Sequence, residues 1–339
     1  MKNIFITGGA GFIGSNLAAH FIKKGKKVTV FDNLSRQGGK ANLDWLSSLG
    51  PFKFTRGDIR NKSELEKAVR GADAILHLAG QVAVTTSVDD PATDFDINAL
   101  GTFNLLEAVR TSGKKIPVIF SSTNKVYGGM ENIKVIEKNG QYIYKDYKFG
   151  IAETKNLDFH SPYGCSKGAA DQYMRDYYRI YDIPTVVFRQ SCIYGPRQFG
   201  IEDQGWVAWF IIAAFSGKKI TVYGDGKQVR DVLFIDDLVG LFDITLANIN
   251  KSAGKIYNVG GGFTNILSVW TKFGPILEDL FGHKIRVSFS RWRPGDQKVY
   301  ISDIRQVKKE LGWQPKVGVK EGISKLFKWV GSNQNLFKS

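Results

Sequence analysis

Three glycines spaced by two residues, Gly8, Gly11 and Gly14, constrain the fold of this chain more than any other feature of its sequence. They stand between an apolar run at residues 3–6, which predicts a β-strand, and a helical pattern at residues 16–24. Glycine at such a turn lets the backbone approach a pyrophosphate, and the free N–H groups at the start of the helix attract its charge. The spacing therefore predicts a dinucleotide-binding turn, with contacts from Gly8, Gly11, Phe12 and Ile13.

Short apolar runs alternate with helical patterns through the first part of the chain. Strands are predicted at residues 27–31, 53–56, 74–77 and 117–120, and helices at residues 62–70 and 95–111. Repeated strand–helix units of this kind form a parallel sheet that is buried on both faces. We therefore expect the α/β fold class, with a Rossmann-type doubly wound parallel sheet.

The pattern becomes shorter and less regular after about residue 120. A long helix is predicted at residues 162–181, a strand at 185–188, and further helices near 205–216 and 235–247. We expect a dinucleotide-binding domain over residues 1–190, which carries the long helix. A smaller, mixed α/β substrate lobe is expected over residues 191–339, partly interleaved with the first domain.

The composition excludes several classes of protein. The 339 residues are 43% hydrophobic and 23% charged, which is unlike disordered, collagenous or coiled-coil sequences. There is no apolar run of membrane-spanning length and no signal peptide, and the two cysteines fit neither a disulfide framework nor a metal site. The net charge of +15 is spread along the chain. We therefore expect a cytoplasmic protein with no metal, membrane or nucleic-acid partner.

Residues that follow the predicted strands indicate which dinucleotide the turn would bind. Asp32 ends the second strand, where a carboxylate accepts hydrogen bonds from the ribose hydroxyls and repels a 2′-phosphate. This favours NAD over NADP, although Arg36 nearby would weaken the preference. The other contacts expected after the second, third and fourth strands are Asn33, Ser35, Arg36, Asp58, Ile59, Leu78, Ala79 and Gly80.

A tyrosine and a lysine four residues apart, Tyr163 and Lys167, indicate acid–base chemistry. On a helix they share one face. A free tyrosine has a pKa of about 10, and an ammonium group beside it stabilises the phenolate and lowers that pKa. Ser121 to Thr123 end the fifth strand, and ligands bind at the carboxyl ends of such strands. The sequence therefore predicts that Tyr163 acts as a base beside Lys167 and Thr123.

Together these residues resemble the extended short-chain dehydrogenase/reductase family, whose members act mostly on nucleotide-linked sugars. The similarity covers nearly the whole chain, from residues 7–14 to residues 230–237. It implies NAD as cofactor, a nucleotide sugar as substrate, and a homodimer or homotetramer. It also implies that Tyr163 accepts the proton of a sugar hydroxyl, that Lys167 holds the nicotinamide ribose and that Thr123 bonds the reacting oxygen. The further cofactor contacts that it implies are Asn98, Ser121 and Arg189.

The resemblance also narrows the expected activity. Members that remove water from the sugar place Asp-Glu after the threonine, whereas Asn124 and Lys125 stand there in this chain. Blocks at residues 31–36, 79–83, 122–128, 158–168 and 203–206 are similar to members that invert C2 of a CDP-linked 3,6-dideoxyhexose through a 2-keto sugar. The substrate contacts that this implies are Thr85, Ser87, Thr123, Asn124, Gln204, Val207, Tyr223, Arg230 and Arg293.

Two other functions are compatible with the sequence. A nucleotide-sugar 4-epimerase or reductase would use Tyr163 and Lys167 in the same way at another carbon. A non-catalytic regulator that binds NAD or nucleic acid would keep the fold, and only the net charge favours it. His77, at the end of an apolar strand, is expected to be a packed core residue, and Cys165 a small packing residue.

Overall fold

The computed structural model describes residues 1–293 and 296–337 and divides the chain into two compact units. Unit 1 comprises Met1–Val126, Phe159–Arg189 and Val239–Tyr257, and unit 2 comprises the rest. The boundary expected at residue 190 coincides with a crossing between the units, directly after Arg189. The chain also crosses after residues 126, 158, 238 and 257, so both units are built from alternating pieces of the sequence.

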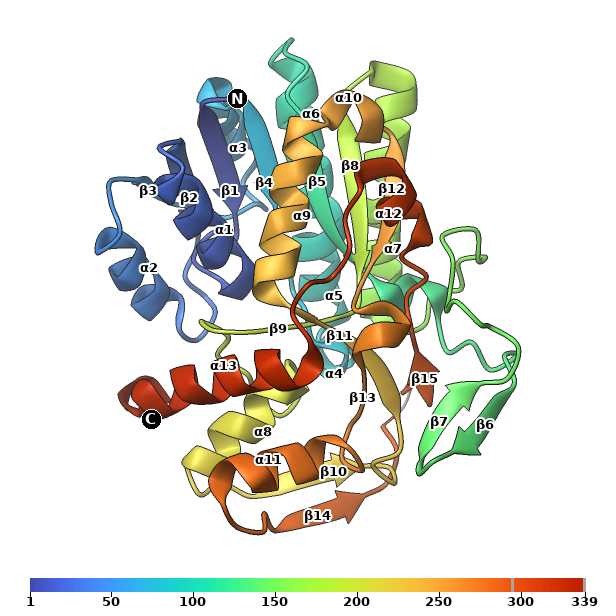
Figure 1. Cartoon of the computed structure of the whole chain (residues 1–339). Helices are drawn as coiled ribbons and strands as arrows, with labels where there is room; N and C mark the ends of the chain where they lie inside the picture. The colour runs from blue at the N-terminus through green and yellow to red at the C-terminus, as the bar shows by residue number, and fades with distance from the viewer. Residues whose placement is uncertain (294–295, 338–339) are drawn as a thin grey trace. The chain divides into compact units, whose positions relative to one another are not determined.

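A seven-stranded sheet forms the centre of unit 1, with the strand order β12-β8-β5-β4-β1-β2-β3. Figure 1 shows the strands side by side in this order. Because β1 pairs in parallel with both β2 and β4, the direction of winding reverses at β1, which confirms the Rossmann-type doubly wound fold. The strands are β1 (Asn3–Thr7), β2 (Lys27–Asp32), β3 (Lys53–Arg56), β4 (Ala74–His77), β5 (Val118–Thr123), β8 (Thr185–Gln190) and β12 (Lys255–Val259).

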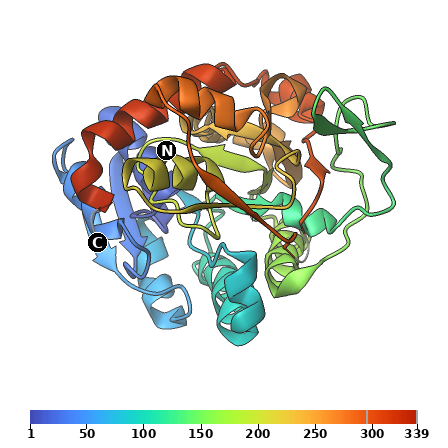
Figure 2. The ribbon, with the colours of Figure 1, turned by 90° about the horizontal axis from the view of Figure 1, so that it is seen from below.

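Helices cover both faces of this sheet. On one face, α1 (Phe12–Lys23) and α9 (Ile235–Ala247) lie together, and Asp243 of α9 pairs with Lys24 at the end of α1. Figure 2 shows the helices of the other face in a row: α3 (Lys62–Ala68), α6 (Gly101–Thr111) and α7 (Ser161–Tyr181). The shorter elements of unit 1 are α2 (Gly39–Ser47), η1 (Val69–Gly71), α4 (Val84–Asp89), α5 (Pro91–Phe95), η2 (Asp96–Leu100), η3 (Asn124–Tyr127) and α10 (Ile249–Ser252).

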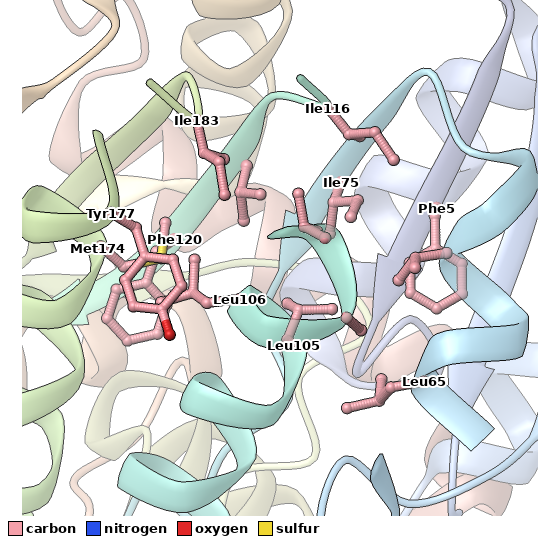
Figure 3. Close-up of a cluster of buried hydrophobic side chains, with 14 of the residues drawn as sticks. Phe5, Leu65, Ile75, Leu105, Leu106, Ile116, Phe120, Met174, Tyr177 and Ile183 are labelled. Carbon is pink, nitrogen blue, oxygen red and sulfur yellow. The ribbon is translucent and has the colours of Figure 1, made fainter. Parts of the chain in front are cut away.

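The main core of unit 1 fills the space between the sheet and the row of α3, α6 and α7. Figure 3 shows side chains from both layers in contact, among them Phe5, Ile75, Phe120, Leu65, Leu105, Leu106 and Met174. Burying a side chain of this size contributes about 1.5–3 kcal/mol. The core therefore gives the carboxyl ends of β1, β4 and β5 a rigid base, and these ends carry the candidate site.

The helix expected at residues 95–111 is interrupted. A π-helical turn, η2, separates α5 from α6, which begins only at Gly101. The side chain of Asn98, in this turn, bonds the backbone of Gln81: it accepts from the N–H at 3.0 Å and donates to the carbonyl at 3.1 Å. A tertiary contact thus holds the wider turn, and such π turns often stand at functional sites.

Unit 2 contains short strands in small sheets, as the irregular pattern indicates. In the largest sheet β11 (Val229–Phe234) pairs with β9 (Cys192–Tyr194), β13 (Ile266–Ser268) and β15 (Val299–Tyr300). The other strands form two pairs, β6 (Val135–Lys138) with β7 (Gln141–Tyr144) and β10 (Ile220–Tyr223) with β14 (Val287–Ser290). The helices are α8 (Trp206–Phe215), η4 (Gly262–Asn265), α11 (Phe273–Phe281), α12 (Arg305–Leu311), α13 (Val319–Ser332) and η5 (Gln334–Phe337).

Candidate active site

The glycine turn between β1 and α1 contains glycines of two kinds. Gly8 has φ +66°, and a Cβ on it would lie 2.6 Å from the backbone nitrogen of Ala79. A Cβ on Gly14 would collide with the carbonyl oxygen of Gly8, so packing of the chain itself requires both residues. Gly11 has an ordinary φ of −71°, and a Cβ there would meet only that same carbonyl, at 3.2 Å. The open side of Gly11 therefore leaves room for a ligand.

The first turn of α1 fits a phosphate group. Gly11 caps the helix without a side-chain hydrogen bond, and the first turn contains no acidic residue. Phe12 and Ile13 are half-buried beside it. Unpaired N–H groups at the start of a helix of this length attract an anion. The residues present at the turn thus suit the pyrophosphate of a dinucleotide.

Asp32, which is expected to contact the ribose hydroxyls, ends β2, and two backbone N–H groups fix its carboxylate. Its carboxylate accepts hydrogen bonds from the backbone N–H groups of Ala10 at 3.0 Å and Leu34 at 2.8 Å. Burial raises its pKa, and these two bonds oppose the rise. Two fixed donors orient the carboxylate and leave it further lone pairs for ribose hydroxyls. Ser35 and Arg36, which follow it, are both exposed.

The residues after β3 divide into one polar group and one core side chain. Asp58 accepts a hydrogen bond from Asn33 at 2.9 Å, and the guanidinium of Arg60 lowers the pKa of Asp58 to about 2. Asn33 and Asp58, both expected cofactor contacts, are thus brought together. Ile59 is 4% exposed and belongs to the hydrophobic core. Its side chain packs inside unit 1.

The segment after β4 is ordered by a buried polar network. His77 is fully buried between the hydroxyls of Thr7 at 2.7 Å and Thr102 at 3.0 Å, and burial lowers its pKa to about 3. His77 is therefore a neutral core residue, as expected. The Thr7 hydroxyl also accepts from the N–H groups of Leu78 and Ala79. These two residues and Gly80 remain half-buried, so their backbone can meet a cofactor.

The tyrosine and lysine of α7 meet the end of β5. Tyr163 is 8% exposed, and its hydroxyl group hydrogen-bonds the hydroxyl group of Thr123. Lys167 donates to the carbonyl of Ser121 at 2.6 Å, and its ammonium nitrogen lies 4.1 Å from the ring centroid of Phe120. The structure therefore brings together the expected set of Thr123, Tyr163 and Lys167.

The glycine after β4 also approaches this set. A Cβ placed on Gly80 would lie 3.8 Å from the ammonium nitrogen of Lys167. The same Cβ would lie 2.9 Å from the amide oxygen of Asn98. The β4 segment, which is expected to contact the cofactor, and the base set thus occupy one end of the sheet.

Burial dominates the electrostatics of this pair and corrects one expectation. It raises the pKa of Tyr163 to about 12, while the hydrogen bond with Thr123 opposes the rise. Burial likewise lowers the pKa of Lys167 to about 7. Burial is thus the largest influence on both groups, and it works against the lowering of the Tyr163 pKa that the sequence predicts.

Arg189, an expected cofactor contact, is paired inside unit 1. It is 2% exposed, and its guanidinium donates two hydrogen bonds of 2.9 Å to the carboxylate of Asp171. Asp171 stands one turn after Lys167 in α7 and also accepts from the hydroxyl of Ser122 at 2.9 Å. Arg189 therefore fixes α7 against the ends of β5 and β8, and its charge is already matched. Sequence reasoning did not identify Asp171, since no motif distinguishes it.

Three further residues expected at the ligand lie in unit 1 with different surroundings. Ser87 is fully buried, donates to the carbonyl of Val84 and accepts from the N–H of Tyr163 at 3.1 Å, so it anchors the start of α7. Asn98, 1% exposed, has its amide bonded within the protein. The hydroxyl of Thr85, by contrast, is buried without a hydrogen-bond partner, as a ligand contact would require. Asn124 is 8% exposed next to Thr123.

In unit 2 an arginine lies over a tyrosine ring. The guanidinium carbon of Arg293 is 3.8 Å from the ring centroid of Tyr223, and its nitrogen pairs with Asp203 at 3.1 Å. The Tyr223 hydroxyl donates to the carboxylate of Glu202 at 3.0 Å. Two of the expected substrate residues are thus assembled, and the acidic groups were not foreseen.

The other residues expected at the substrate in unit 2 have separate surroundings. Arg230 is 9% exposed and reaches Asp296 at 3.8 Å. Gln204 is half-buried at the bridge with Ile201, and Val207 is buried in α8.

Residues 1–293 and 296–337 contain neither a candidate metal-binding cluster nor a candidate membrane-spanning helix. No three His, Cys, Asp or Glu side chains there gather in an arrangement that could hold a metal ion. No helix in that part of the chain is both long enough and apolar enough to cross a membrane. Cys165, expected to be a packing residue, is exposed on α7, since its side chain lies on the face away from the core.

A dinucleotide turn and a buried Thr–Tyr–Lys set on one doubly wound sheet define the chain as a protein of the short-chain dehydrogenase/reductase class. The comparison with protein families is more specific. The model described as GDP-mannose 4,6 dehydratase matches residues 5–326. The chain belongs to this family.

Individual relatives cover nearly the whole chain. It is 48% identical over 336 residues to CDP-paratose 2-epimerase of Salmonella typhi, with 97% of this chain and 99% of that protein aligned. A dTDP-glucose 4,6-dehydratase from Streptomyces venezuelae, solved with NAD, has a TM-score of 0.85, 29% identity and 98% coverage of both chains. A UDP-glucuronic acid 4-epimerase from Bacillus cereus, in complex with UDP-glucuronic acid and NAD, has a TM-score of 0.84, 28% identity and coverage of 97% and 99%.

Proposed function

We propose that this chain inverts C2 of a CDP-linked 3,6-dideoxyhexose and converts CDP-paratose to CDP-tyvelose with NAD as a retained cofactor. The observation that carries the proposal is the 48% identity to CDP-paratose 2-epimerase over 97% of the chain. The buried set of Thr123, Tyr163 and Lys167 supports it, because such a set suits the oxidation of a secondary alcohol.

The residues around the glycine turn support NAD as the cofactor. The open side of Gly11 and the first turn of α1 suit the pyrophosphate, and the oriented carboxylate of Asp32 suits the ribose hydroxyls. Asn33 and Asp58, which are hydrogen-bonded to each other, offer further polar groups for the cofactor. The related dehydratase and 4-epimerase structures were both solved with NAD.

The carbon–hydrogen bond at C2 has no activating group, so no side chain can remove its proton. NAD, when bound, supplies the chemistry that is needed, because it takes hydride from such a carbon and returns it. Tyr163 takes the proton of the C2 hydroxyl and can pass its own proton toward Lys167, whose pKa of about 7 leaves it partly neutral. The Thr123 hydroxyl orients the same oxygen. Loss of the O–H and C2–H bonds gives a 2-keto sugar.

Return of the hydride to the opposite face of C2, with the proton returned through Tyr163, completes the reaction without net oxidation. The sugar must present both faces of C2 to the same site. This requires that the protein binds the nucleotide firmly while the sugar ring remains able to turn over. Arginine suits a diphosphate because its planar fork binds two oxygens at once. Arg293 over Tyr223 is a candidate for this anchor, with Arg230 as the second arginine.

The test is turnover of purified protein with CDP-paratose, followed by proton NMR of the sugar. We expect inversion at C2 alone, with no added NAD and no accumulation of NADH. UDP-glucose and UDP-galactose serve as parallel substrates, because structural relatives include 4-epimerases. Inversion only at C4, or formation of a reduced sugar, would replace this proposal with the 4-epimerase or reductase alternative.

We also propose that the chain forms a homodimer through α6 and α7. These helices lie side by side, and the face around them exposes large apolar side chains: Leu100 at 38%, Tyr173 at 44% and Ile180 at 63%. Apolar patches of this kind on helices mark protein interfaces. Analytical ultracentrifugation should give twice the chain mass, and Tyr173→Glu should give monomers. A monomeric wild-type protein at micromolar concentration would contradict the proposal.

We further propose that the chain works in the cytoplasm. Its two cysteines, Cys165 and Cys192, form no disulfide in the described part of the chain, as is usual in a reducing compartment. Fractionation of the source cells should recover the protein with the soluble fraction and without a disulfide. Recovery in the periplasmic or membrane fraction would contradict this location.

A further inference from the structure

Asp94 is a buried carboxylate that no motif in the sequence identifies. It lies in α5, a short helix between β4 and the π turn, and it is 1% exposed. α5 packs directly against α7, the helix of Tyr163 and Lys167. A carboxylate in the interior is costly unless hydrogen bonds or an opposite charge compensate it. Its partners therefore define what it does.

Two neutral donors hold the Asp94 carboxylate. The hydroxyl of Ser166 donates to one oxygen at 2.5 Å, and the amide of Asn98 donates to the other at 3.0 Å. Ser166 stands between Tyr163 and Lys167 on α7. Asn98 also bonds the backbone of Gln81, in the segment after β4. Asp94 thus ties the turn of α7 that carries the base to the segment that is expected to contact the cofactor.

No cation pairs with Asp94 among residues 1–293 and 296–337, so its charge acts on the groups around it. Burial raises the pKa of Asp94, and Ser166, Lys167 and Asn98 oppose that rise. In turn, Asp94 raises the pKa of Lys167 against the larger effect of burial. It also raises the pKa of Tyr163, because a second negative charge nearby disfavours the phenolate.

The other charged groups around Lys167 do not replace Asp94. Asp171 favours the ammonium form of Lys167 more strongly than Asp94 does, but its carboxylate is bound at both oxygens by Arg189 and so has a separate structural role. His77 is neutral because its pKa is lowered to about 3. Asp94 is therefore the negative charge near Lys167 that no arginine matches.

We propose that Asp94 is a positioning residue for the reaction: it fixes α7 through Ser166 and adds a second negative charge, beside that of Asp171, to the buried surroundings of Lys167. This rests on the proposed roles of Tyr163 and Lys167. The ammonium form of Lys167 can hold ribose hydroxyls and stabilise a phenolate, and its neutral form can accept the proton of Tyr163. Asp94 thus helps to set the pH at which the pair changes between its two states.

The first test measures the proton affinity of Lys167 without any substrate. In protein labelled with [13Cε]lysine, the signal of Lys167 is assigned by its loss in Lys167→Arg, and its midpoint should lie near pH 7. In Asp94→Asn the midpoint should fall by about one unit, since one nearby negative charge is lost. Asp94→Ser is smaller, makes the same change in charge and serves if Asp94→Asn does not fold. Asp94→Glu keeps the charge and should restore the midpoint.

Asp90→Asn is the matched control. Asp90 begins the same short helix, is exposed, and caps it by accepting from the N–H of Thr93 at 3.0 Å. Asparagine can keep this cap, so the variant removes only an exposed charge from the same helix, and the Lys167 midpoint should stay at its wild-type value. An unchanged midpoint in the folded Asp94 variants, or an equal fall in Asp90→Asn, would overturn the proposal.

The second test uses the pH dependence of kcat for CDP-paratose. A pair that must lose one proton gives a rate that rises with pH through the midpoint. In Asp94→Asn this acid limb should move to lower pH by the same amount as the NMR midpoint, while a residue with only a structural role would lower kcat at every pH. If the midpoint moves but no protein turns over CDP-paratose, the proposed function fails and the role of Asp94 stands.

Discussion

At the scale of the residue, Tyr163 and Lys167 depend on burial for their chemistry. Because the two groups interact, each proton that is lost is lost by the pair and not by one residue alone. Burial raises the pKa of Tyr163 to about 12 and lowers that of Lys167 to about 7, so Lys167 is the member of the pair that changes its proton nearer neutral pH. The base is thus the pair, in which tyrosine contacts the sugar.

Replacing Tyr163 with phenylalanine tests this role. The variant loses the hydroxyl that bonds Thr123, so turnover should fall by about 10²–10⁴-fold, the usual contribution of a positioned acid–base group. NAD content after purification should not change. Tyr177→Phe is the control, because the Tyr177 hydroxyl on the same helix bonds Glu107 at 2.7 Å. Near-normal turnover in Tyr163→Phe, measured by NMR of the sugar, would remove Tyr163 from its role.

The sequence predicts the residues of the base but not what holds them. The spacing of Tyr163 and Lys167 is local, and the helical repeat alone places them on one face. The partners of α7 come from other elements of the fold. Asp94 in α5 reaches Ser166 across 72 residues, and Arg189 in strand β8 reaches Asp171. Such pairings arise only when the sheet forms, and nothing near Asp94 in the sequence marks it as buried.

At the scale of the element, different glycines of the turn serve different purposes: Gly14 is needed for packing, and Gly11 is expected to face the ligand. Gly14→Ala should lower the melting temperature and cost about 1–3 kcal/mol, because its Cβ meets the backbone of Gly8. Gly11→Ala should stay within about 1 kcal/mol of the wild type, since its φ is ordinary and only one contact at 3.2 Å tightens. It should nevertheless purify with less NAD.

The measurement for this pair is thermal unfolding by circular dichroism, together with the nucleotide released on denaturation. Each glycine variant acts as the control for the other, because one changes the packing and the other changes the ligand surface. Full NAD content in a folded Gly11→Ala protein would contradict the assignment of this turn to the pyrophosphate.

Elements that depend on distant contacts are those that the sequence does not predict. Apolar runs identify the strands of the large sheet, since each strand is buried on both faces. The π turn at Asp96–Leu100 depends on Asn98 reaching the backbone of Gln81. The β6–β7 hairpin lies in a polar stretch, and its first strand is mostly exposed, so it lacks a clear alternation of apolar residues. A tertiary hydrogen bond thus accounts for the π turn, and weak alternation explains why the sequence does not predict the hairpin.

At the scale of the whole molecule, the chain passes five times between two units, and each unit supplies expected functional residues. The base and the dinucleotide turn belong to unit 1, and the arginines expected at the diphosphate belong to unit 2. A single boundary drawn from the sequence does not describe this arrangement, because β12 and α9 follow large parts of unit 2 along the chain. Loss of periodicity after residue 120 shows only where the alternation begins.

A reaction that oxidises and reduces the same carbon makes a prediction about the hydrogen at C2. CDP-paratose with deuterium at C2 should give CDP-tyvelose with deuterium at C2, since hydride on a nicotinamide does not exchange with water. In the matched experiment, unlabelled substrate turned over in D₂O should give product without deuterium at C2. Mass spectrometry and proton NMR of the product measure both. Exchange of the C2 hydrogen with solvent would require deprotonation at carbon, which the buried set of Tyr163, Lys167 and Thr123 could not perform on an unactivated C–H bond.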